Sequence, residues 1–85
     1  MKVRFSSHAL GELARRRIGR EVAERVLASP GQSVGERSGR ICHQSRVHFA
    51  DGEFLVGVIV DPATEPPTVI TVYRTSKIEK VWRAR

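Results

Sequence analysis

The fold is decided by nine residues near the C-terminus, Val69-Ile70-Thr71-Val72-Tyr73-Arg74-Thr75-Ser76-Lys77. This run begins with β-branched residues, which favour a strand, and ends in hydroxyl, phenol and cationic side chains. Because side chains alternate along a strand, we expect Ile70 and Val72 on one face. The other face should carry Thr71, Tyr73 and Thr75. A strand that is apolar on one face and polar on the other predicts a half-covered sheet with a site on its open face.

The N-terminal third predicts one short strand followed by a pair of helices. Val3 and Phe5 alternate with charged residues, which is a brief strand signal. Apolar residues then recur at helical spacing over residues 8–17 and again over 20–28, with Gly19 between the two runs. The helices are therefore expected to form a hairpin whose second arm ends at Ser29-Pro30-Gly31.

The remainder predicts antiparallel strands joined by turns. A short strand around Val34 is followed by strands over residues 40–49 and 54–60, and Asp51-Gly52 between these two is typical of a tight hairpin turn. A proline-rich loop over residues 61–67 leads into the last strand, and a short helix is expected from Lys77. The sequence thus predicts one α+β domain over residues 1–85: an N-terminal helical hairpin packed on an antiparallel sheet of about four strands, with a short C-terminal helix.

Composition restricts where the protein works. The chain has 85 residues and is 40% hydrophobic, which suits one folded domain with a single core. Its lone Cys42 cannot form an internal disulfide, so a cytoplasmic protein is expected. No apolar run approaches the roughly 20 residues that span a bilayer, so no membrane association is expected.

The positive charge is unevenly distributed along the sequence. The net charge is +6, yet residues 50–73 contain four acidic residues and no Lys or Arg, so the other segments together carry +10. If these segments meet in space, they form a basic face suited to the phosphates of RNA or to an acidic protein partner. A merely solvated basic surface is the alternative.

No metal or cofactor is expected. Cys42 and His43 are neighbours on a strand and point to opposite faces, and no glycine-rich phosphate loop follows a strand. The remaining His, Tyr, Thr, Arg and Lys side chains suit RNA cleavage without metal, which needs a base for the 2′-hydroxyl, an acid for the leaving 5′-oxygen and cations for the phosphate.

The candidate catalytic residues are His8, Tyr73 and Thr75. His8 can act as acid or base near neutral pH but can also simply pack at the start of its helix, and Tyr73 can be a proton-transfer group, a base-stacking group or an ordinary sheet residue. Among the cations, Arg46 is expected on the open face with Tyr73. Arg74 and Lys77 are candidates for phosphate binding because the strand end holds them in place, although strict alternation places Arg74 on the helix-covered face.

A set of short motifs in order resembles the DUF 4258 family (domain of unknown function). The motifs are Ser7-His8-Ala9, Arg16-Arg17-Ile18, Val22, Val26-Leu27, Pro30, Gly39-Arg40 and Val69-Ile70-Thr71-Val72-Tyr73. That family is thought to belong with the RelE-like small ribonucleases, in which a helical hairpin packs on an antiparallel sheet. The chain departs from the family at Glu12, where an arginine is common.

The resemblance implies a metal-independent ribonuclease or the toxin of a toxin–antitoxin pair. It points to His8, Arg16, Arg40, Thr71 and Tyr73 as matched positions. It also implies RNA as a substrate, with or without the ribosome, and an acidic antitoxin-type protein as a partner. The alternative hypothesis is a non-catalytic basic module that binds RNA or an acidic protein.

Overall fold

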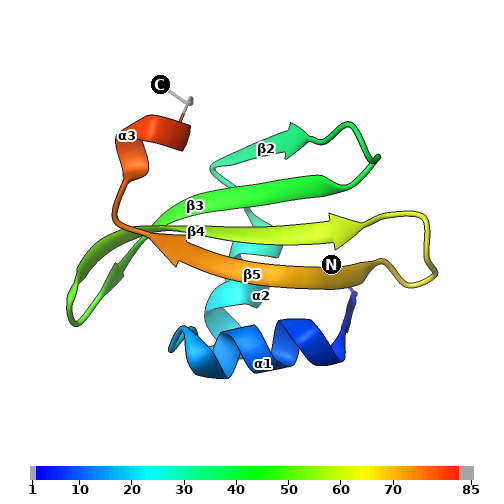
Figure 1. Ribbon diagram of the computed structural model, residues 1–85, viewed down its shortest axis with the longest axis horizontal. Helices are drawn as coiled ribbons and strands as arrows, with labels where there is room; N and C mark the ends of the chain where they lie inside the picture. Colours follow the sequence, from blue (N-terminus) through cyan, green and yellow to red (C-terminus); the bar gives the residue numbers. More distant parts are fainter. Residues whose placement is uncertain (1, 83–85) are drawn as a thin grey trace.

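The computed structural model describes residues 2–82 of the chain (Figure 1). Met1 and residues 83–85 of the predicted domain lie outside this range. The order of the elements and the α+β class are confirmed. Their bounds are β1 Arg4–Phe5, α1 Ser7–Arg15, α2 Arg20–Ala28, β2 Gln32–Gly35, β3 Ile41–Phe49, β4 Gly52–Asp61, β5 Thr68–Thr75 and α3 Ile78–Val81.

The strands form one mixed sheet in the order β1-β5-β4-β3-β2. The pairs from β2 to β5 are antiparallel, as predicted. The prediction of an antiparallel sheet of about four strands is wrong at one edge, where β1 adds a fifth strand parallel to β5. A strand of two residues shows too little alternation to reveal its partner or direction from sequence. Its place is fixed instead by backbone hydrogen bonds, from Arg4 N to Pro67 O at 2.9 Å and from Ser6 N to Val69 O at 3.0 Å.

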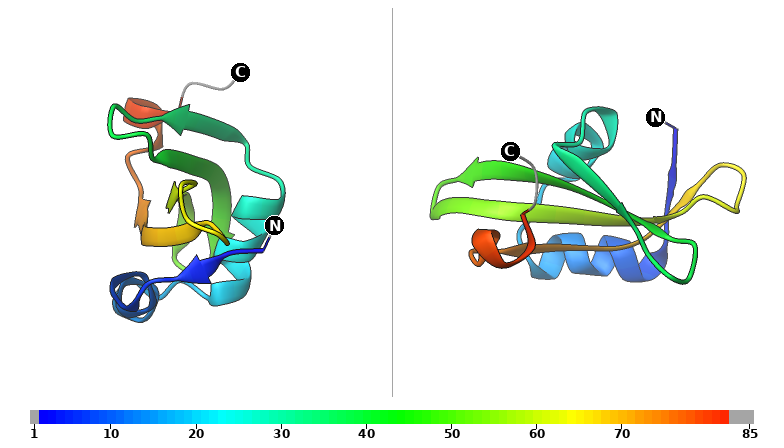
Figure 2. Two further views of the ribbon diagram at one scale, coloured as in Figure 1. Left: turned by 90° about the vertical axis from the view of Figure 1, so that its right-hand side faces the viewer. Right: turned by 90° about the horizontal axis from the view of Figure 1, so that it is seen from above.

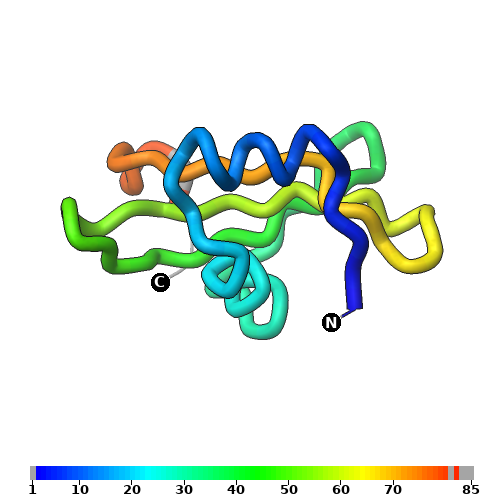
Figure 3. The backbone as a smooth tube through the Cα atoms, turned by 90° about the horizontal axis from the view of Figure 1, so that it is seen from below, coloured from blue at the N-terminus to red at the C-terminus, as the bar shows by residue number. Residues whose placement is uncertain are grey.

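Both long helices cover the same face of the sheet (Figures 1 and 3). α1 packs along β5, and α2 packs against β4 and β3. α1 starts where Ser6 Oγ accepts a hydrogen bond from Ala9 N at 3.0 Å and donates one to the Ile70 carbonyl at 3.1 Å. It ends at Arg15, two residues before the predicted end, because Arg17 adopts the left-handed region at φ 56°.

The hydrophobic core fills the space between the helices and the sheet. The sheet contributes valines whose side chains alternate with those of the open face. The buried cluster consists of Phe5, Ala9, Leu13, Ile18, Val22, Ala23, Val26, Leu27, Val56, Val58, Val60, Val69 and Val72. Val69 takes the place predicted for Ile70, which is only partly buried, because the β4–β5 register shifts between Ile59 and Val60.

The other face of the sheet carries α3 at the end where β5 leaves the sheet (Figure 2, left). The predicted short C-terminal helix is therefore confirmed, beginning at Ile78. Trp82 packs at the start of β2, where a Cβ added to Gly31 would lie 2.5 Å from its Cη2. Within residues 2–82 there is no helix with the length and apolar character needed to cross a membrane.

Candidate functional site

The centre of the open face is built around Tyr73 by three adjacent strands. Tyr73 lies on β5 opposite Gly57 of β4, and Gly57 lies opposite Gln44 of β3. The tyrosine ring crosses directly over Gly57, since a Cβ added there would be 2.3 Å from Tyr73 Cζ. The phenol oxygen thereby reaches β3, where Gln44 Nε2 donates a hydrogen bond to it at 2.8 Å and Cys42 Sγ lies 3.6 Å away.

Gln44 is buried and holds Tyr73 in one orientation. Its side-chain oxygen accepts a hydrogen bond from the Gln32 amide of β2, while its nitrogen donates to the tyrosine. The tyrosine oxygen therefore already accepts one hydrogen bond. Its own O–H is directed either to Cys42 or to a ligand.

Both titratable groups of this network are uncharged at neutral pH. Burial is the main cause that raises the pKa of Tyr73 to about 12, and the hydrogen bond with Cys42 adds to the shift. Burial also raises the pKa of the Cys42 thiol. Tyr73 can thus give up a proton to a strongly basic leaving group but cannot serve as a base, and Cys42 is not a thiolate nucleophile.

Two hollows open beside this network. The first, called here the Tyr73 hollow, has a volume of about 320 Å³ and is lined by residues that include Glu36, Cys42, Gln44, Tyr73 and Lys80. The second, called the α3 hollow, has a volume of about 610 Å³ and is lined by residues that include Arg46, Lys77 and Lys80. Lys80 borders both, so the two hollows are adjacent.

Three further predicted site residues lie on the open face or at its α3 end. Thr75 is opposite Leu55, and its Oγ1 accepts a hydrogen bond from Lys77 N at 3.1 Å. Arg46 donates to Glu53 at 2.8 Å and remains half exposed. Lys77 is exposed immediately before α3. The structure therefore brings Tyr73, Thr75, Arg46 and Lys77 to one side of the sheet.

His8 lies on the opposite side of the sheet from Tyr73. It is exposed in the first turn of α1, which belongs to the helical layer. His8 and Tyr73 consequently do not form one proton-transfer pair. Arg40 is exposed just before β3 in the hairpin that follows β2.

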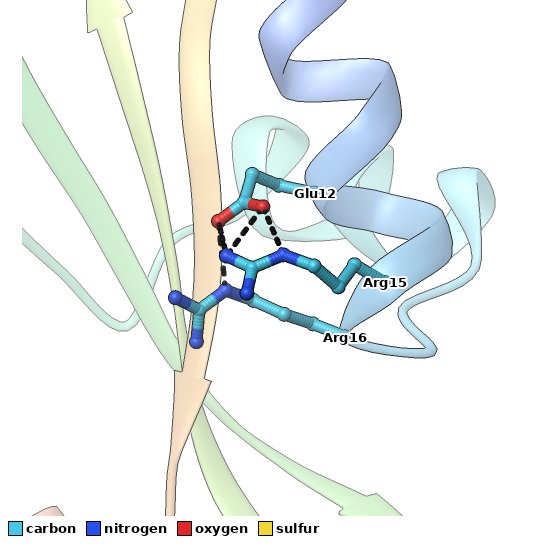
Figure 4. A network of polar contacts seen from close by, with 3 residues as sticks. All are labelled: Glu12, Arg15 and Arg16. Carbon is cyan, nitrogen blue, oxygen red and sulfur yellow. Dashed lines mark hydrogen bonds and ion pairs between the residues drawn. The ribbon is translucent and has the colours of Figure 1, made fainter.

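Arg16 lies at the end of α1 in an ion-pair cluster with Glu12 and Arg15 (Figure 4). Its Nε is 3.1 Å from one Glu12 oxygen, while Arg15 contacts both oxygens at 2.7 Å. Hydrogen bonds from Arg15 and then Arg16 lower the pKa of Glu12 to about 2. Glu12 thus organises two cations on the helical side.

Arg74 is enclosed by aromatic rings on the helix-covered side. Its register partner is Val56, a core residue, so strict alternation gave the correct face. The guanidinium lies 4.6 Å from the Phe49 ring centroid and 4.5 Å from that of Phe54, and it pairs with Asp51 at 3.2 Å. Its side chain is only 15% exposed, so it contributes to structure rather than to the open face.

Comparison with known proteins gave no family assignment: no protein-family model, curated protein or solved structure matches the chain significantly. In residues 2–82, no three His, Cys, Asp or Glu side chains are grouped so that they could hold a metal ion.

The structure adds site residues that the sequence did not single out. Gly57 has a signal in the sequence, because a glycine inside an apolar strand often marks a close approach. Lys80 also has a signal in the sequence, because it lies about one helical turn after Lys77 in the predicted C-terminal helix. Glu36 has no such signal, since it belongs to a turn with no periodic pattern.

Proposed function

We propose that this protein is a RelE-like, metal-independent ribonuclease of the toxin type. RNA would bind on the open face of the sheet, and Tyr73 would protonate the leaving 5′-oxygen. The α+β class, the helical layer on one face and the resemblance of the short motifs to those of the DUF 4258 family support this proposal. An acidic antitoxin-type protein would cover the same face of the sheet.

One observation carries the proposal: a protonated phenol that accepts a hydrogen bond from a buried side chain borders a hollow whose Lys80 also lines the adjacent α3 hollow. Gln44 donates a hydrogen bond to the phenol oxygen, and Lys80 lines the Tyr73 hollow together with Tyr73. Arg46 and Lys77 line the adjacent α3 hollow, where they can contact the next phosphate of an RNA strand. Such an acid and nearby cations are two of the three groups that cleavage of RNA requires, the third being a base.

The direct test is incubation of purified protein with RNA in chelator, with and without ribosomes. We expect fragments that end in a 2′,3′-cyclic phosphate, and we expect Tyr73→Phe to lower the rate by roughly 10²–10⁴-fold, as is typical for removal of a general acid. DNA of the same sequence should stay intact, because it lacks the 2′-hydroxyl. Intact RNA under all conditions would refute the nuclease proposal.

A non-catalytic RNA-binding module is the second candidate. The position of His8 favours it, since the predicted second proton-transfer group lies on the other side of the sheet. Binding to uncleavable 2′-O-methyl RNA, titrated across salt, tests this candidate. Lys80→Ala should weaken binding and reduce the salt slope by about one. The matched control is Lys2→Ala, which removes the same charge beside β1, at the opposite end of the sheet from α3 (Figure 1).

A further inference from the structure

We infer that the Tyr73 hollow holds the scissile phosphate, with the Glu36 carboxylate as the base that takes the 2′-hydroxyl proton and Lys80 as the cation on the phosphate. This inference rests on the proposed ribonuclease function and assigns the base that His8 cannot supply. It also places the reaction in the hollow between Tyr73 and the β2–β3 hairpin, and not beside Thr75.

Glu36 is held at the rim of the hollow by its backbone. Its N–H donates to the Arg40 carbonyl at 2.8 Å, which extends the β2–β3 ladder by one pair, and its carbonyl accepts from Gly39 N at 2.9 Å. Glu36 directly follows β2, and alternation places it on the same face as Val34, whose partner Cys42 contacts Tyr73. The hairpin therefore presents the carboxylate to the side of the sheet where the phenol lies.

The carboxylate of Glu36 is unengaged in the part of the chain that the structure describes. It makes no side-chain hydrogen bond or ion pair there, and the residue is exposed. Its charge nevertheless affects the groups on the other side of the hollow. Burial is the main cause that raises the pKa of Tyr73 and of Cys42, and the negative charge of Glu36 raises both further. A carboxylate and a phenol thus border one space without neutralising each other.

Lys80 is the third residue of the proposed site, after Glu36 and Tyr73. It projects from α3 and lines the same hollow as Glu36 and Tyr73. In residues 2–82, no ion pair within 4.0 Å joins Lys80 to Glu36, so the space between the charges is open to a substrate. The volume of about 320 Å³ is at the low end for ligand pockets, which suits one phosphate and its ribose rather than a whole strand.

The proposed step balances without a further reactant. Glu36 takes the proton from the 2′-hydroxyl as that oxygen bonds to phosphorus, and the bond from phosphorus to the 5′-oxygen breaks. Tyr73 gives its proton to the departing 5′-oxygen, so the products are a 2′,3′-cyclic phosphate and a 5′-hydroxyl. Lys80 stabilises the charge that develops on the phosphate. Proton exchange with water then restores the carboxylate and the phenol.

The test combines two substitutions with two substrates. The substrates are an RNA and the same RNA with sulfur in place of the 5′-oxygen at the bond that the unsubstituted protein cleaves first. Sulfur leaves without being protonated, so it bypasses the acid but still needs the base. We expect Glu36→Gln to lower cleavage of both substrates by about 10²–10⁴-fold. Tyr73→Phe should lower cleavage of the oxygen substrate alone.

Controls separate a lost base from lost binding or folding. Glu24→Gln removes a carboxylate from the exposed side of α2 and should cleave like the unsubstituted protein. Glu36→Gln should bind 2′-O-methyl RNA at least as tightly, because it removes a negative charge. Undiminished cleavage by Glu36→Gln, while the unsubstituted protein is active, would overturn this inference alone. Absence of cleavage by the unsubstituted protein would overturn the proposed function with it.

Discussion

Substitution of Gly57 by alanine should displace Tyr73 without unfolding the protein. A Cβ at Gly57 would lie 2.3 Å from Tyr73 Cζ and 2.6 Å from its Oη. Carbon atoms in contact prefer about 3.5–4.0 Å, so the ring must withdraw by more than about 1 Å. A hydrogen bond that starts at 2.8 Å does not survive such a movement, so Gln44 loses its contact with the phenol.

The cost in stability is expected to be small, because two effects oppose each other. Loss of the hydrogen bond destabilises the protein by about 0.5–1.5 kcal/mol. Replacement of a strand glycine by alanine restricts the unfolded chain, which stabilises the folded protein by roughly 0.5–1 kcal/mol. The net change in the free energy of unfolding should therefore stay within about 1 kcal/mol, while the environment of the phenol changes completely.

Absorbance titration of the phenol measures this displacement directly, because Tyr73 is the only tyrosine in the sequence. In the unsubstituted protein the pKa should be near 12, since burial disfavours the charged phenolate. In Gly57→Ala it should fall toward the ordinary value of 10. Circular dichroism at each pH shows whether the fold persists.

Gly35→Ala is the matched control for this titration. Gly35 is also a strand glycine, but a Cβ added there meets no atom within 4 Å, so the titration of Tyr73 should not change. An unchanged titration in Gly57→Ala would mean that the ring does not rest on Gly57. The proposed geometry of the site would then be wrong.

Two further predictions concern stability on the helix-covered side. Arg74→Ala removes two ring contacts and should lower the free energy of unfolding in urea by about 1–3 kcal/mol, and Arg74→Lys should restore only part of it; no change would mean that the stacking contributes nothing. The pKa of Glu12 is lowered from 4.5 to about 2, so its stabilising effect is present above 4.5 and lost as the pH falls toward 2. Glu12→Gln should therefore show a shallower loss of stability over that range in acid denaturation, and an equally steep loss would contradict the ion-pair cluster.

Local patterns in the sequence predicted most of the fold. The helical spacing and the residues that end each run located α1 and α2, and turn residues located the hairpin at Asp51. Those signals are local, whereas the errors arose from contacts between distant segments. The register shift opposite Ile59 moved Val69 into the core in place of Ile70, and no property of residues 69–72 alone fixes that choice.

The candidate site was predictable where side-chain alternation decides the outcome. It placed Tyr73, Thr75 and Arg46 on the open face and assigned Arg74 to the other. Alternation does not show what lies beside a residue on that face. The enclosure of Arg74 depends on Phe49 and Phe54, whose ring centroids lie 5.7 Å apart in the β3–β4 hairpin. Only the three-dimensional structure reveals this arrangement.

The position of Glu36 shows why the proposed base escaped sequence-based prediction. More than thirty residues separate Glu36 from Tyr73 in the sequence, and the pairing of four strands is needed to bring the two to one hollow. An acidic residue in a turn otherwise indicates only a solvated loop. The basic composition predicts phosphate-binding cations but no proton acceptor, and cleavage of RNA needs both. A carboxylate that has no ion-pair partner within residues 2–82 and that borders one hollow with a protonated phenol is therefore the more informative feature of this site.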